Sequence, residues 1–454
     1  AYSPNAVTST LLAELAVLRD QLLDRLRPDS RSAAVRDQLD ASTLALLQRL
    51  NTELADKVAA TRHHQYGVLE RYRDAFRSHP GWVRKAIEDY SSIVGATCQQ
   101  SASRQMSDLK NAAGDSMAGM RFTSVVIDEA ARANPLDLFI PMALAKRRIV
   151  LVGDHRQLPH LLDTDIEEDI RAQRGDQVHS TTYKDSLFER LWRQFKQREA
   201  ADGFSRVVML DTQFRMHPRL GDFVSQQFYE NAGLGKVHSG RKAEEFIAEV
   251  PGFGAVVCAW RDVPAQAGSE ESHGASRGRR SEAKQVAREV QHLLKVLQQN
   301  MSVGVITFYA AQRDCIFEEL AGFGIAEKGD SGWRVRPEHA ANAQCTERLR
   351  IGTVDAFQGK EFDVVVLSVV RSNPLSLGLR EETDSEEAYE KSASRKFGHL
   401  RTSNRLNVAM SRQRRLLVAV GDEAMFSGQA ACQAVPEMNA FLELCQQEAH
   451  HVIA

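Results

Sequence analysis

Short apolar runs alternate with helical stretches from about residue 91 onward, and this alternation limits the possible folds more than any other feature of the sequence. The runs have the length of strands and are apolar at consecutive positions, as strands buried on both faces are. Strands that alternate with helices form βαβ units, which build parallel sheets. The runs are Phe122–Ile127, Arg148–Val152, Arg206–Leu210, Gly254–Ala259, Val303–Thr307, Val364–Val369 and Leu416–Val420. We therefore expect an α/β fold built on parallel sheets.

The first ninety residues have a different pattern. Leucine and valine recur at spacings of three and four within Val7–Leu26 and again within Leu39–Val58, and Pro28 ends the first run. This spacing predicts two long amphipathic helices that pack antiparallel, followed by a third helix over about Tyr66–Phe76. The segment is either a plain helical hairpin or a stalk that positions a nucleic-acid-binding accessory domain.

The change in pattern suggests three segments. We expect a helical segment over residues 1–90, one α/β domain over residues 91–203, and a second over residues 204–454. The second boundary is placed after the charged helix that ends near residues 200–205. Residues 261–281, rich in Gly, Ser and Arg, and residues 374–397, which are acidic and polar, are expected to be surface loops.

Composition excludes some classes of protein. The 58 basic and 60 acidic residues nearly cancel, so the chain does not coat nucleic acid by bulk charge, although a local basic groove stays open. The six cysteines are scattered without a CxxC pair, as expected for reduced thiols in the cytoplasm. No apolar run approaches the ~20 residues of a membrane span, so a membrane partner is not expected.

Two adjacent carboxylates follow the first apolar run. Asp128 and Glu129 come directly after Val125–Ile127, at the carboxyl end of an expected parallel strand, where such sheets form their sites. An aspartate there can hold Mg²⁺ through water, since Mg²⁺ prefers oxygen ligands and keeps much of its hydration shell. The neighbouring glutamate can deprotonate the water that attacks a γ-phosphate. On its own this pair is a weak signal.

The next apolar run leads into a Gly-Asp-His-Arg-Gln-Leu-Pro segment, residues 153–159. Gly153 allows the backbone to approach a ligand closely. Gln157 has both a donor and an acceptor, so it can sense a terminal phosphate and its water. The alternative is an ordinary Gly-Asp turn before a helix.

Two arginines stand at the starts of later elements. Arg215 lies in Gln-Phe-Arg-Met-His-Pro, residues 213–218, and Arg412 ends Asn-Arg-Leu-Asn-Val-Ala-Met-Ser-Arg, residues 404–412. Arginine donates planar, bidentate hydrogen bonds to a transferred phosphoryl group. Two arginines from a second domain would complete a site between domains when these close. Taken separately, either could be an ordinary surface arginine.

Two further segments combine strand ends with polar residues. Gly359 belongs to a Gln-Gly turn whose amides can face an anion, and Lys360 and Glu361 follow it. Glu361 could accept from a ribose hydroxyl or order an arginine. After Val303–Thr307, Thr307 could bond a phosphate and Tyr309 could stack on a base. A half-buried tyrosine at a strand end is the alternative for Tyr309.

The ordered set IDEAA, GDHRQLP, QFRMHP, ITFYAAQR, TVDAFQGKEFD and NRLNVAMSR resembles the superfamily 1 helicases of the 5′-to-3′ branch. That group includes the nonsense-mediated-decay helicase and related DNA helicase-nucleases. The resemblance covers roughly residues 91–425. It implies two tandem RecA-like motor domains with ATP and Mg²⁺ between them, an amino-terminal helical stalk inserted in the first, and single-stranded DNA or RNA as a partner. The stalk could also contact other proteins.

The resemblance also implies roles for particular residues. Asp128 would position magnesium, Glu129 would activate water, and Gln157 would contact the γ-phosphate region. Arg215 and Arg412 would be arginine fingers. The remaining assignments are Phe214 beside the adenine, Gly359, Lys360 and Glu361 at the nucleotide, and Thr97, Thr307, Tyr309 and Thr353 along the nucleic acid. Thr97 belongs to Ile93–Cys98, which resembles the strand and turn that touches nucleic acid in the first motor domain.

One motif of the family is absent from the sequence. No G-x-x-x-x-G-K-[ST] segment occurs: Gly235-Lys236 is followed by Val, and Gly359-Lys360 by Glu. A P-loop supplies backbone amides and a lysine to the β- and γ-phosphates. Because the family places this loop before the helical insertion, we expect truncation before Ala1. The leading hypothesis is an ATP-dependent helicase, and the alternatives are a catalytically inactive scaffold or a helicase module within a nuclease or defence effector.

Overall fold

The computed structural model describes residues 16–18, 45, 48–54, 64–78, 81, 90–103, 122–159, 186–246, 250–380 and 385–453. Contacts divide the chain into two units, Ala1–Gly95 and Ala96–Ala454. In the first unit, α3 spans His64–Ser78 and confirms the helix predicted over Tyr66–Phe76. The predicted antiparallel pair over Val7–Leu26 and Leu39–Val58 lies largely outside the described residues, so it stays a prediction. None of the helices in the described ranges is both long and apolar enough to cross a bilayer.

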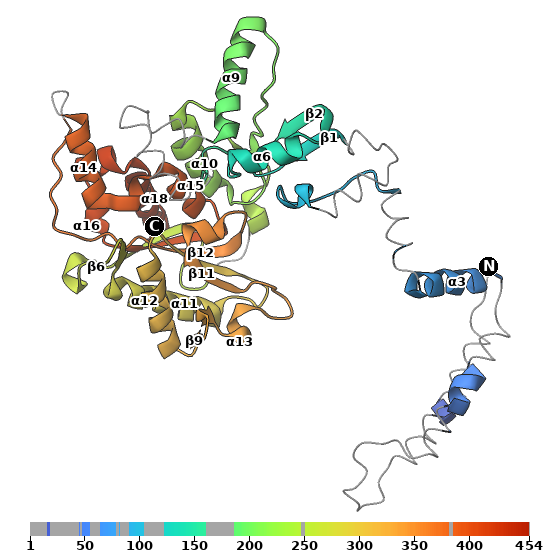
Figure 1. Cartoon of the computed structure of the whole chain (residues 1–454). Helices are drawn as coiled ribbons and strands as arrows, with labels where there is room; N and C mark the ends of the chain where they lie inside the picture. Colours follow the sequence, from blue (N-terminus) through green and yellow to red (C-terminus); the bar gives the residue numbers. More distant parts are fainter. Residues whose placement is uncertain are drawn as a thin grey trace, which may run out of the picture. The chain divides into compact units, whose positions relative to one another are not determined.

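A five-stranded parallel sheet forms the centre of the second unit (Figure 1). The order of its strands is β11-β8-β12-β13-β5, and every neighbouring pair is parallel. Their bounds are Cys258–Asp262 (β5), Val303–Thr307 (β8), Leu349–Thr353 (β11), Phe362–Ser368 (β12) and Gln413–Gly421 (β13). The strands predicted at Val303–Thr307, Val364–Val369 and Leu416–Val420 are confirmed, and the fifth strand begins four residues later than the run at Gly254–Ala259.

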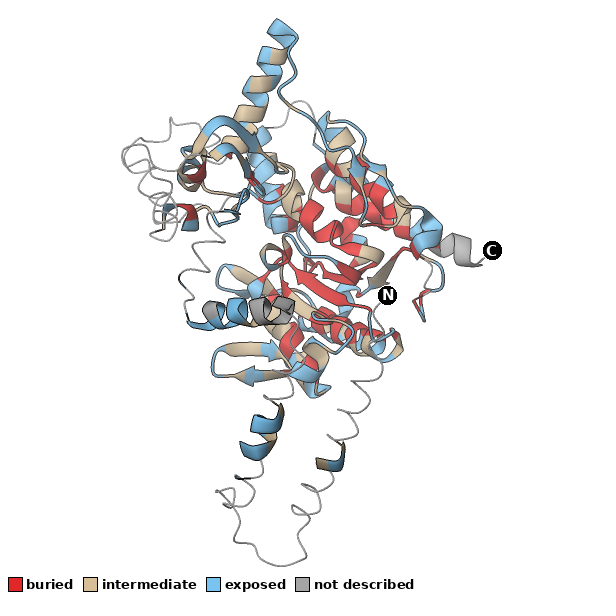
Figure 2. Cartoon of the chain, turned by 90° about the vertical axis from the view of Figure 1, so that its right-hand side faces the viewer, coloured by how far each residue is buried: buried red, intermediate tan, exposed pale blue. Residues whose placement is uncertain are grey.

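Helices cover both faces of this sheet, because alternate residues of its strands point to opposite sides. In β12, Val364 and Val366 join one apolar core with α11 and α12, whereas Val365 and Leu367 join the other with α10, α14, α15 and α18. Figure 2 shows the buried residues gathered on the sheet and on the helix faces beside it. The helix bounds are Pro218–Val224 (α10), Arg280–Val296 (α11), Ala310–Gly322 (α12), Glu386–Phe397 (α14), Ser403–Met410 (α15) and Pro436–Ile453 (α18).

A smaller parallel pair precedes the five-stranded sheet. β1 (Phe122–Ile127) lies beside β2 (Ala145–Leu151), which confirms two of the predicted strands. In sequence, α6 (Pro135–Met142) lies between the two strands and α9 (Leu187–Asp202) follows β2. Apolar side chains of both strands stay uncovered by the described residues: Val126 is 66% exposed and Ile149 is 42% exposed. This pair carries the first two candidate motifs at its carboxyl ends.

The remaining elements are short. Strands are Thr212–Gln213 (β3), His238–Ser239 (β4), Glu271–His273 (β6), Ser276–Gly278 (β7), Ala326–Gly329 (β9) and Gly332–Val335 (β10). Helices are Pro337–Ala340 (α13), Glu423–Phe426 (α16) and Gln429–Ala434 (α17). Single helical turns are Gln100–Ala102 (η1), Ser225–Tyr229 (η2), Glu230–Ala232 (η3), Ala243–Phe246 (η4), Ala265–Ala267 (η5), Val354–Phe357 (η6) and Gly398–Arg401 (η7).

Three sequence-based expectations are wrong in detail. Arg206–Leu210 is not a strand: it has no ladder partner, and Val208 is 83% exposed. Residues 374–397 are not all loop, since α14 occupies Glu386–Phe397 and buries Ala393 and Phe397. Residues 261–281 contain the β6–β7 hairpin and the fully buried Arg279. For Arg206–Leu210 and residues 261–281, contacts distant in sequence, which local composition does not record, decide the outcome.

Candidate active site

The carboxyl end of β1 presents two exposed carboxylates. Asp128 and Glu129 follow Ile127, and the backbone amide of Glu129 donates to Asp128 Oδ1 at 2.9 Å. Glu129 has φ 52°, a left-handed conformation that is uncommon for a residue other than glycine. Such conformations cost free energy and gather at functional sites. The turn therefore sets the backbone of Glu129 in an uncommon conformation at the strand end.

The segment after β2 lies against this turn. A Cβ on Gly153 would stand 2.8 Å from the amide nitrogen of Ala131, so only glycine fits. The close approach expected of Gly153 is thus to the chain's own backbone. Asp154 orders the next residues, because Oδ1 accepts from the amide of Arg156 at 2.9 Å and Oδ2 accepts from Gln157 Nε2 at 2.9 Å.

Two asparagines of α15 bind the main chain of the same segment. Asn404 Nδ2 donates to the carbonyl of His155 at 3.0 Å and to that of Gln157 at 2.6 Å. Asn407 Nδ2 donates to the carbonyl of Arg156 at 3.0 Å. Residues three apart share one face of a helix, so α15 binds three consecutive carbonyls with two side chains. The loop that carries Gln157 is therefore fixed to the element that leads to Arg412.

Arg412 links the loop that carries Gln157 to the part of the site that contains Arg215. It is only 1% exposed, and its Nη2 donates to Gln157 Oε1 at 3.3 Å and to Ser411 Oγ at 2.8 Å. Burial, and then the positive charge of Arg215, lower the pKa of Arg412 to about 10, while the charge of Glu129 acts in the opposite direction. Arg412 thus stays cationic at neutral pH, and the negative charge of Glu129 stabilises this cation.

Arg215 is held by a turn that Gln213 organises. Gln213 Oε1 accepts from the amides of Arg215, at 2.9 Å, and of Met216, at 2.8 Å. The Arg215 guanidinium then donates to Glu361 at 3.0 Å and to the carbonyl of Ser411 at 3.0 Å. Because Arg412 follows Ser411, the two arginines are brought to one place.

Glu361 serves these arginines. Partial burial would raise the pKa of its carboxyl, but hydrogen bonds from Arg414 and Arg215 outweigh that effect and lower it. Glu361 thus contacts two arginines, and a ribose contact, the other role left open by the sequence, stays a prediction. Lys360, next to it, pairs with Glu347 at 3.1 Å and is exposed, as is Gly359, which has φ 72°.

Phe214 is the exposed aromatic residue of this region. Its side chain is 64% exposed, and it lies directly over Gly240, where an added Cβ would stand 2.2 Å from Phe214 Cε1. The absence of a side chain at Gly240 leaves room for the ring at this place. Phe214 is thus available for stacking on a planar ligand.

Two of the residues expected along the nucleic acid lie at the edge of the five-stranded sheet opposite to Glu361 and Arg412, which precede β12 and β13. Thr353, Thr307 and Ser368 are register partners in a row at the carboxyl ends of β11, β8 and β12. Thr353 is half-buried, whereas Thr307 has no exposed area, and its Oγ1 has no hydrogen-bond partner. Tyr309 is 4% exposed, and its hydroxyl accepts from the amide of His399 at 3.2 Å. Direct contact of these side chains with a nucleic acid stays a prediction.

Thr97 is exposed at the start of η1. Its Oγ1 accepts from the amide of Gln100 at 3.2 Å, and Gln100 Oε1 accepts from the amide of Thr97 at 3.2 Å. This reciprocal pair closes the turn that precedes η1. It fixes the conformation of the segment and leaves the Thr97 side chain at the surface.

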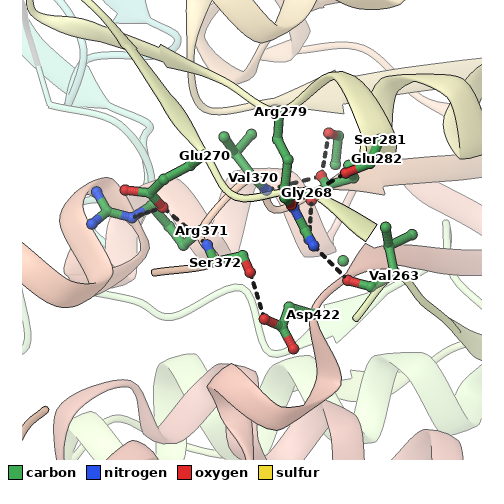
Figure 3. A network of polar contacts seen from close by, with 12 residues as sticks. Val263, Gly268, Glu270, Arg279, Ser281, Glu282, Val370, Arg371, Ser372 and Asp422 are labelled. Atoms are coloured by element: carbon green, nitrogen blue, oxygen red, sulfur yellow. Dashed lines mark hydrogen bonds and ion pairs between the residues drawn. The ribbon is translucent and has the colours of Figure 1, made fainter. Parts of the chain in front are cut away.

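A buried ionic network stands at the carboxyl ends of the sheet (Figure 3). Arg279 donates to the carbonyls of Gly268, at 2.7 Å, and Val263, at 2.8 Å, and lies 3.5 Å from Glu282. Glu282 accepts from the amide of Val370 at 2.9 Å, although Val370 has φ 70°, a strained conformation for a β-branched residue. The network anchors the segment that carries the β6–β7 hairpin.

The structure thus brings together Gln157, Arg412, Arg215 and Glu361, with Glu129 near enough to act on Arg412. Among the described residues, no three His, Cys, Asp or Glu side chains gather as a metal-binding group. A magnesium ion held by Asp128, waters and phosphate oxygens needs no such group, so the exposed Asp128 fits that role.

Sequence reasoning missed several residues of this region: Asp154, Tyr229, Asn404, Asn407 and Arg414. The two asparagines had a signal, since they lie three apart in the motif that ends in the assigned Arg412. Tyr229 had none, because its hydroxyl donates to Asp154, which lies 75 residues earlier.

Comparison with known proteins agrees with this geometry. A family model described as an AAA domain matches residues 183–424, more than half of the chain, and a second model of the same description matches residues 7–164. The chain therefore belongs to the AAA-domain family, within it to the superfamily 1 helicases of the nonsense-mediated-decay type, and the expected α/β fold of two RecA-like motor domains is confirmed.

Particular relatives are similar over most of this chain. "Regulator of nonsense transcripts 1 homolog" of Neurospora crassa is 30% identical over 68% of this chain and 23% of its own length. "ATP-dependent helicase NAM7" of Saccharomyces cerevisiae is 30% identical over 68% of this chain and 26% of its own. This chain thus spans about a quarter of such relatives. An arterivirus helicase structure aligns with 70% of this chain and 43% of its own at 13% identity, but its TM-score of 0.29 supports no argument.

Proposed function

We propose that this chain works in an ATP-dependent translocase or helicase that couples ATP hydrolysis to movement along single-stranded DNA or RNA. The observation that supports this most directly is the contact between Gln157 and Arg412 at 3.3 Å, with Arg215 and Glu129 beside it. Residues that precede α9 in the sequence and residues that follow it converge there, in the arrangement that γ-phosphate hydrolysis requires. The relative named an ATP-dependent helicase agrees with this proposal.

The carboxylates would divide the work of hydrolysis. Glu129 would take the proton of the attacking water, and its fixed left-handed backbone supports such a role. Asp128 would hold Mg²⁺ through water at the end of β1. When bound, the ion would neutralise charge that develops on the phosphate oxygens.

The remaining nucleotide residues would recognise the substrate. Arg215 and Arg412 would stabilise the transferred phosphoryl group, and Phe214 would lie beside the adenine. Glu361 would hold Arg215 until nucleotide binds, since the pair is already formed at 3.0 Å. Gly359 and Lys360 would stand at the edge of the same site.

Nucleic acid would bind along Thr97, Thr307, Tyr309 and Thr353. The row of Thr307 and Thr353 at adjacent strand ends supports this assignment. The unpartnered Thr307 Oγ1 would offer a hydrogen-bonding group to a phosphate once the side chains that bury it move apart. Because such contacts follow the backbone of a single strand, DNA and RNA are equally suitable. Movement from 5′ to 3′ is proposed from the family alone.

We also propose residues 1–90 as a helical accessory segment, residues 91–203 and 204–454 as the two motor domains, and the cytoplasm as the location. The accessory segment could meet partner proteins through α3, where Tyr72 and Phe76 are 63% and 48% exposed and one helical turn apart. Loss of a co-purifying partner in a Tyr72→Ser, Phe76→Ser variant would test that contact.

Substitution of the proposed base tests the function. In the protein as encoded, with whatever sequence precedes Ala1, Glu129→Gln should lower nucleic-acid-stimulated ATP turnover by at least about 100-fold, because the attacking water loses its proton acceptor. ATP affinity should change less than about threefold, since Gln keeps the size of the side chain and the phosphate contacts. Turnover and equilibrium binding of a fluorescent ATP analogue are the measurements.

The control is Glu338→Gln, an exposed carboxylate of α13 outside the site, which should retain normal turnover. Normal turnover in the Glu129→Gln protein would remove the base assignment. A wild-type protein that binds nucleic acid but neither binds nor hydrolyses ATP would favour the alternative function, a catalytically inactive scaffold.

A further inference from the structure

The orientation of the Gln157 side-chain amide is determined by its two neighbours. Nε2 stands 2.9 Å from Asp154 Oδ2, and Oε1 stands 3.3 Å from Arg412 Nη2. An ionised carboxylate only accepts and a guanidinium only donates. A flipped amide would place oxygen against oxygen and nitrogen against nitrogen. Gln157 therefore presents its acceptor, and not its donor, on the side where Arg412 lies.

Tyr229 supports the carboxylate that fixes this orientation. Its hydroxyl donates to Asp154 Oδ2, the same oxygen that accepts from Gln157. Asn407 Nδ2 lies 3.3 Å from the Tyr229 oxygen and can only donate to it, so the phenolic hydrogen is left for Asp154. Burial, and then the charge of Asp154, raise the pKa of Tyr229, which keeps this hydrogen in place at any physiological pH.

The backbone around Tyr229 has an unusual conformation that serves the same contact. Helix α10 continues directly into η2, a π-helical turn over Ser225–Tyr229. Such turns are rare and occur often at functional sites. This turn also places the carbonyl of Phe228 where it accepts from Arg156 Nε at 3.0 Å. This π-helical turn thus contacts two residues of the loop that carries Gln157, namely Asp154 and Arg156.

We propose that Tyr229 is a positioning residue for ATP hydrolysis: through Asp154 it holds Gln157 so that Oε1 accepts a hydrogen bond from the attacking water. This inference rests on the proposed function. In the step itself, the water oxygen bonds to the γ-phosphorus, the bond from that phosphorus to the bridging oxygen of ADP breaks, and Glu129 takes the proton. Gln157 orients the water, and neither Tyr229 nor Asp154 touches a reacting atom.

The position of Tyr229 also links the elements that follow α9 in the sequence to the orientation of this water. Tyr229, Asn407 and Asn404 all lie after α9 in sequence, and all bind the loop of residues 154–157. A displacement of α10 or α15 would therefore move Asp154 and release the Gln157 amide. The water would then be oriented only while these elements are seated on the loop.

Removal of the Tyr229 hydroxyl tests the proposal. In the protein as encoded, Tyr229→Phe should lower kcat for ATP on the order of 10-fold, the effect of one lost hydrogen bond to a charged group, and leave the KM within about twofold. Affinity for ADP with aluminium fluoride, which mimics the transferring phosphoryl group, should fall by a similar factor while affinity for ADP alone stays unchanged. A merely structural role would weaken both ligands alike.

Tyr389→Phe is the matched control, because the Tyr389 hydroxyl is buried without a hydrogen-bond partner. It should match the wild type in every assay. Asp154→Asn provides a second variant, in which an amide hydrogen faces either Gln157 Nε2 or the Arg156 amide, and it should show the same selective loss, larger in size. Wild-type kcat in both variants, or equal loss of ADP and of ADP with aluminium fluoride, would overturn the proposal. A wild-type protein without ATPase activity would overturn the proposed function and this inference with it.

Discussion

Arg215 and Arg414 form ion pairs with the same carboxylate, Glu361, yet only Arg215 also reaches Ser411 and the neighbourhood of Arg412. The two arginines therefore allow the contribution of the proposed phosphate contact of Arg215 to be separated from that of an ion pair. Exposed ion pairs contribute little to stability, about 0–1 kcal/mol. A residue that stabilises charge on a transferred phosphoryl group contributes far more to turnover.

Conservative substitution of each arginine distinguishes these contributions. Arg215→Lys should lower kcat by at least about 100-fold, because lysine keeps the charge but not the planar pair of donors. Arg414→Lys should change kcat by less than about threefold. Steady-state ATPase assays of both variants are the measurement, and equal losses would mean that Glu361, rather than Arg215, matters to the nucleotide.

The assigned site residues that sequence alone could place are those in the six motifs. Gln157, Arg215 and Arg412 are predicted to share one site, and side-chain contacts bring them together: Arg412 donates to Gln157, and Arg215 donates to the carbonyl of Ser411. Gln157 follows β2, whereas Arg412 precedes β13, so one sheet edge does not account for their meeting. Tyr229 and Asp154 were not assigned, since their contact joins residues distant in sequence and follows a π-helical turn that no local pattern marks. Their roles stay proposals until variants are measured.

At the scale of elements, local pattern and long-range pairing contribute differently. Helix α14 had a usable signal, since Tyr389, Ala393 and Phe397 recur every four residues, but the acidic composition obscured it. Arg206–Leu210 had the composition of a strand and is not one. A strand needs a partner for its backbone hydrogen bonds, and the described residues provide none for this run.

The element with the clearest dependence on pH is α11, which carries the buried Glu282. Burial outweighs the hydrogen bond from Ser368 and the charge of Arg279 and raises the pKa of Glu282 from 4.5 to about 7. The folded chain thus binds this proton more tightly than the unfolded chain. That contribution to stability is fully present below the unfolded pKa and is lost as the pH rises toward 7.

Glu282→Gln should remove this titration. Between pH 5.5 and 7.5 the unfolding temperature of the wild type should fall relative to that of the variant, because glutamine does not titrate. Thermal unfolding followed by circular dichroism across this range is the measurement, with Glu338→Gln as the exposed control that should follow the wild type. Parallel curves for wild type and Glu282→Gln would show that Glu282 keeps one charge state throughout.

At the scale of the second unit, apolar packing and polar contacts hold different parts. The five-stranded sheet is buried on both faces by two large cores, whereas β1 and β2 share a small one with Ile127 and Leu138. Polar contacts from Asn404, Asn407 and Arg412 join the loop after β2 to the larger part. Such contacts are directional and individually modest, so they can be broken and remade during a catalytic cycle.

This difference should appear as a difference in amide hydrogen exchange. Local opening needs least free energy where few apolar contacts are lost. Val126 in β1 is 66% exposed, and Val365 in β12 is fully buried between paired strands. We therefore expect peptides covering β1 to exchange at least about 100-fold faster than those covering β12 in this chain. Mass spectrometry after timed exchange in D₂O is the measurement. Equal protection would mean that further contacts cover β1 in solution. The polar contacts between the loop after β2 and the larger part would then not be the weakest connection in the molecule.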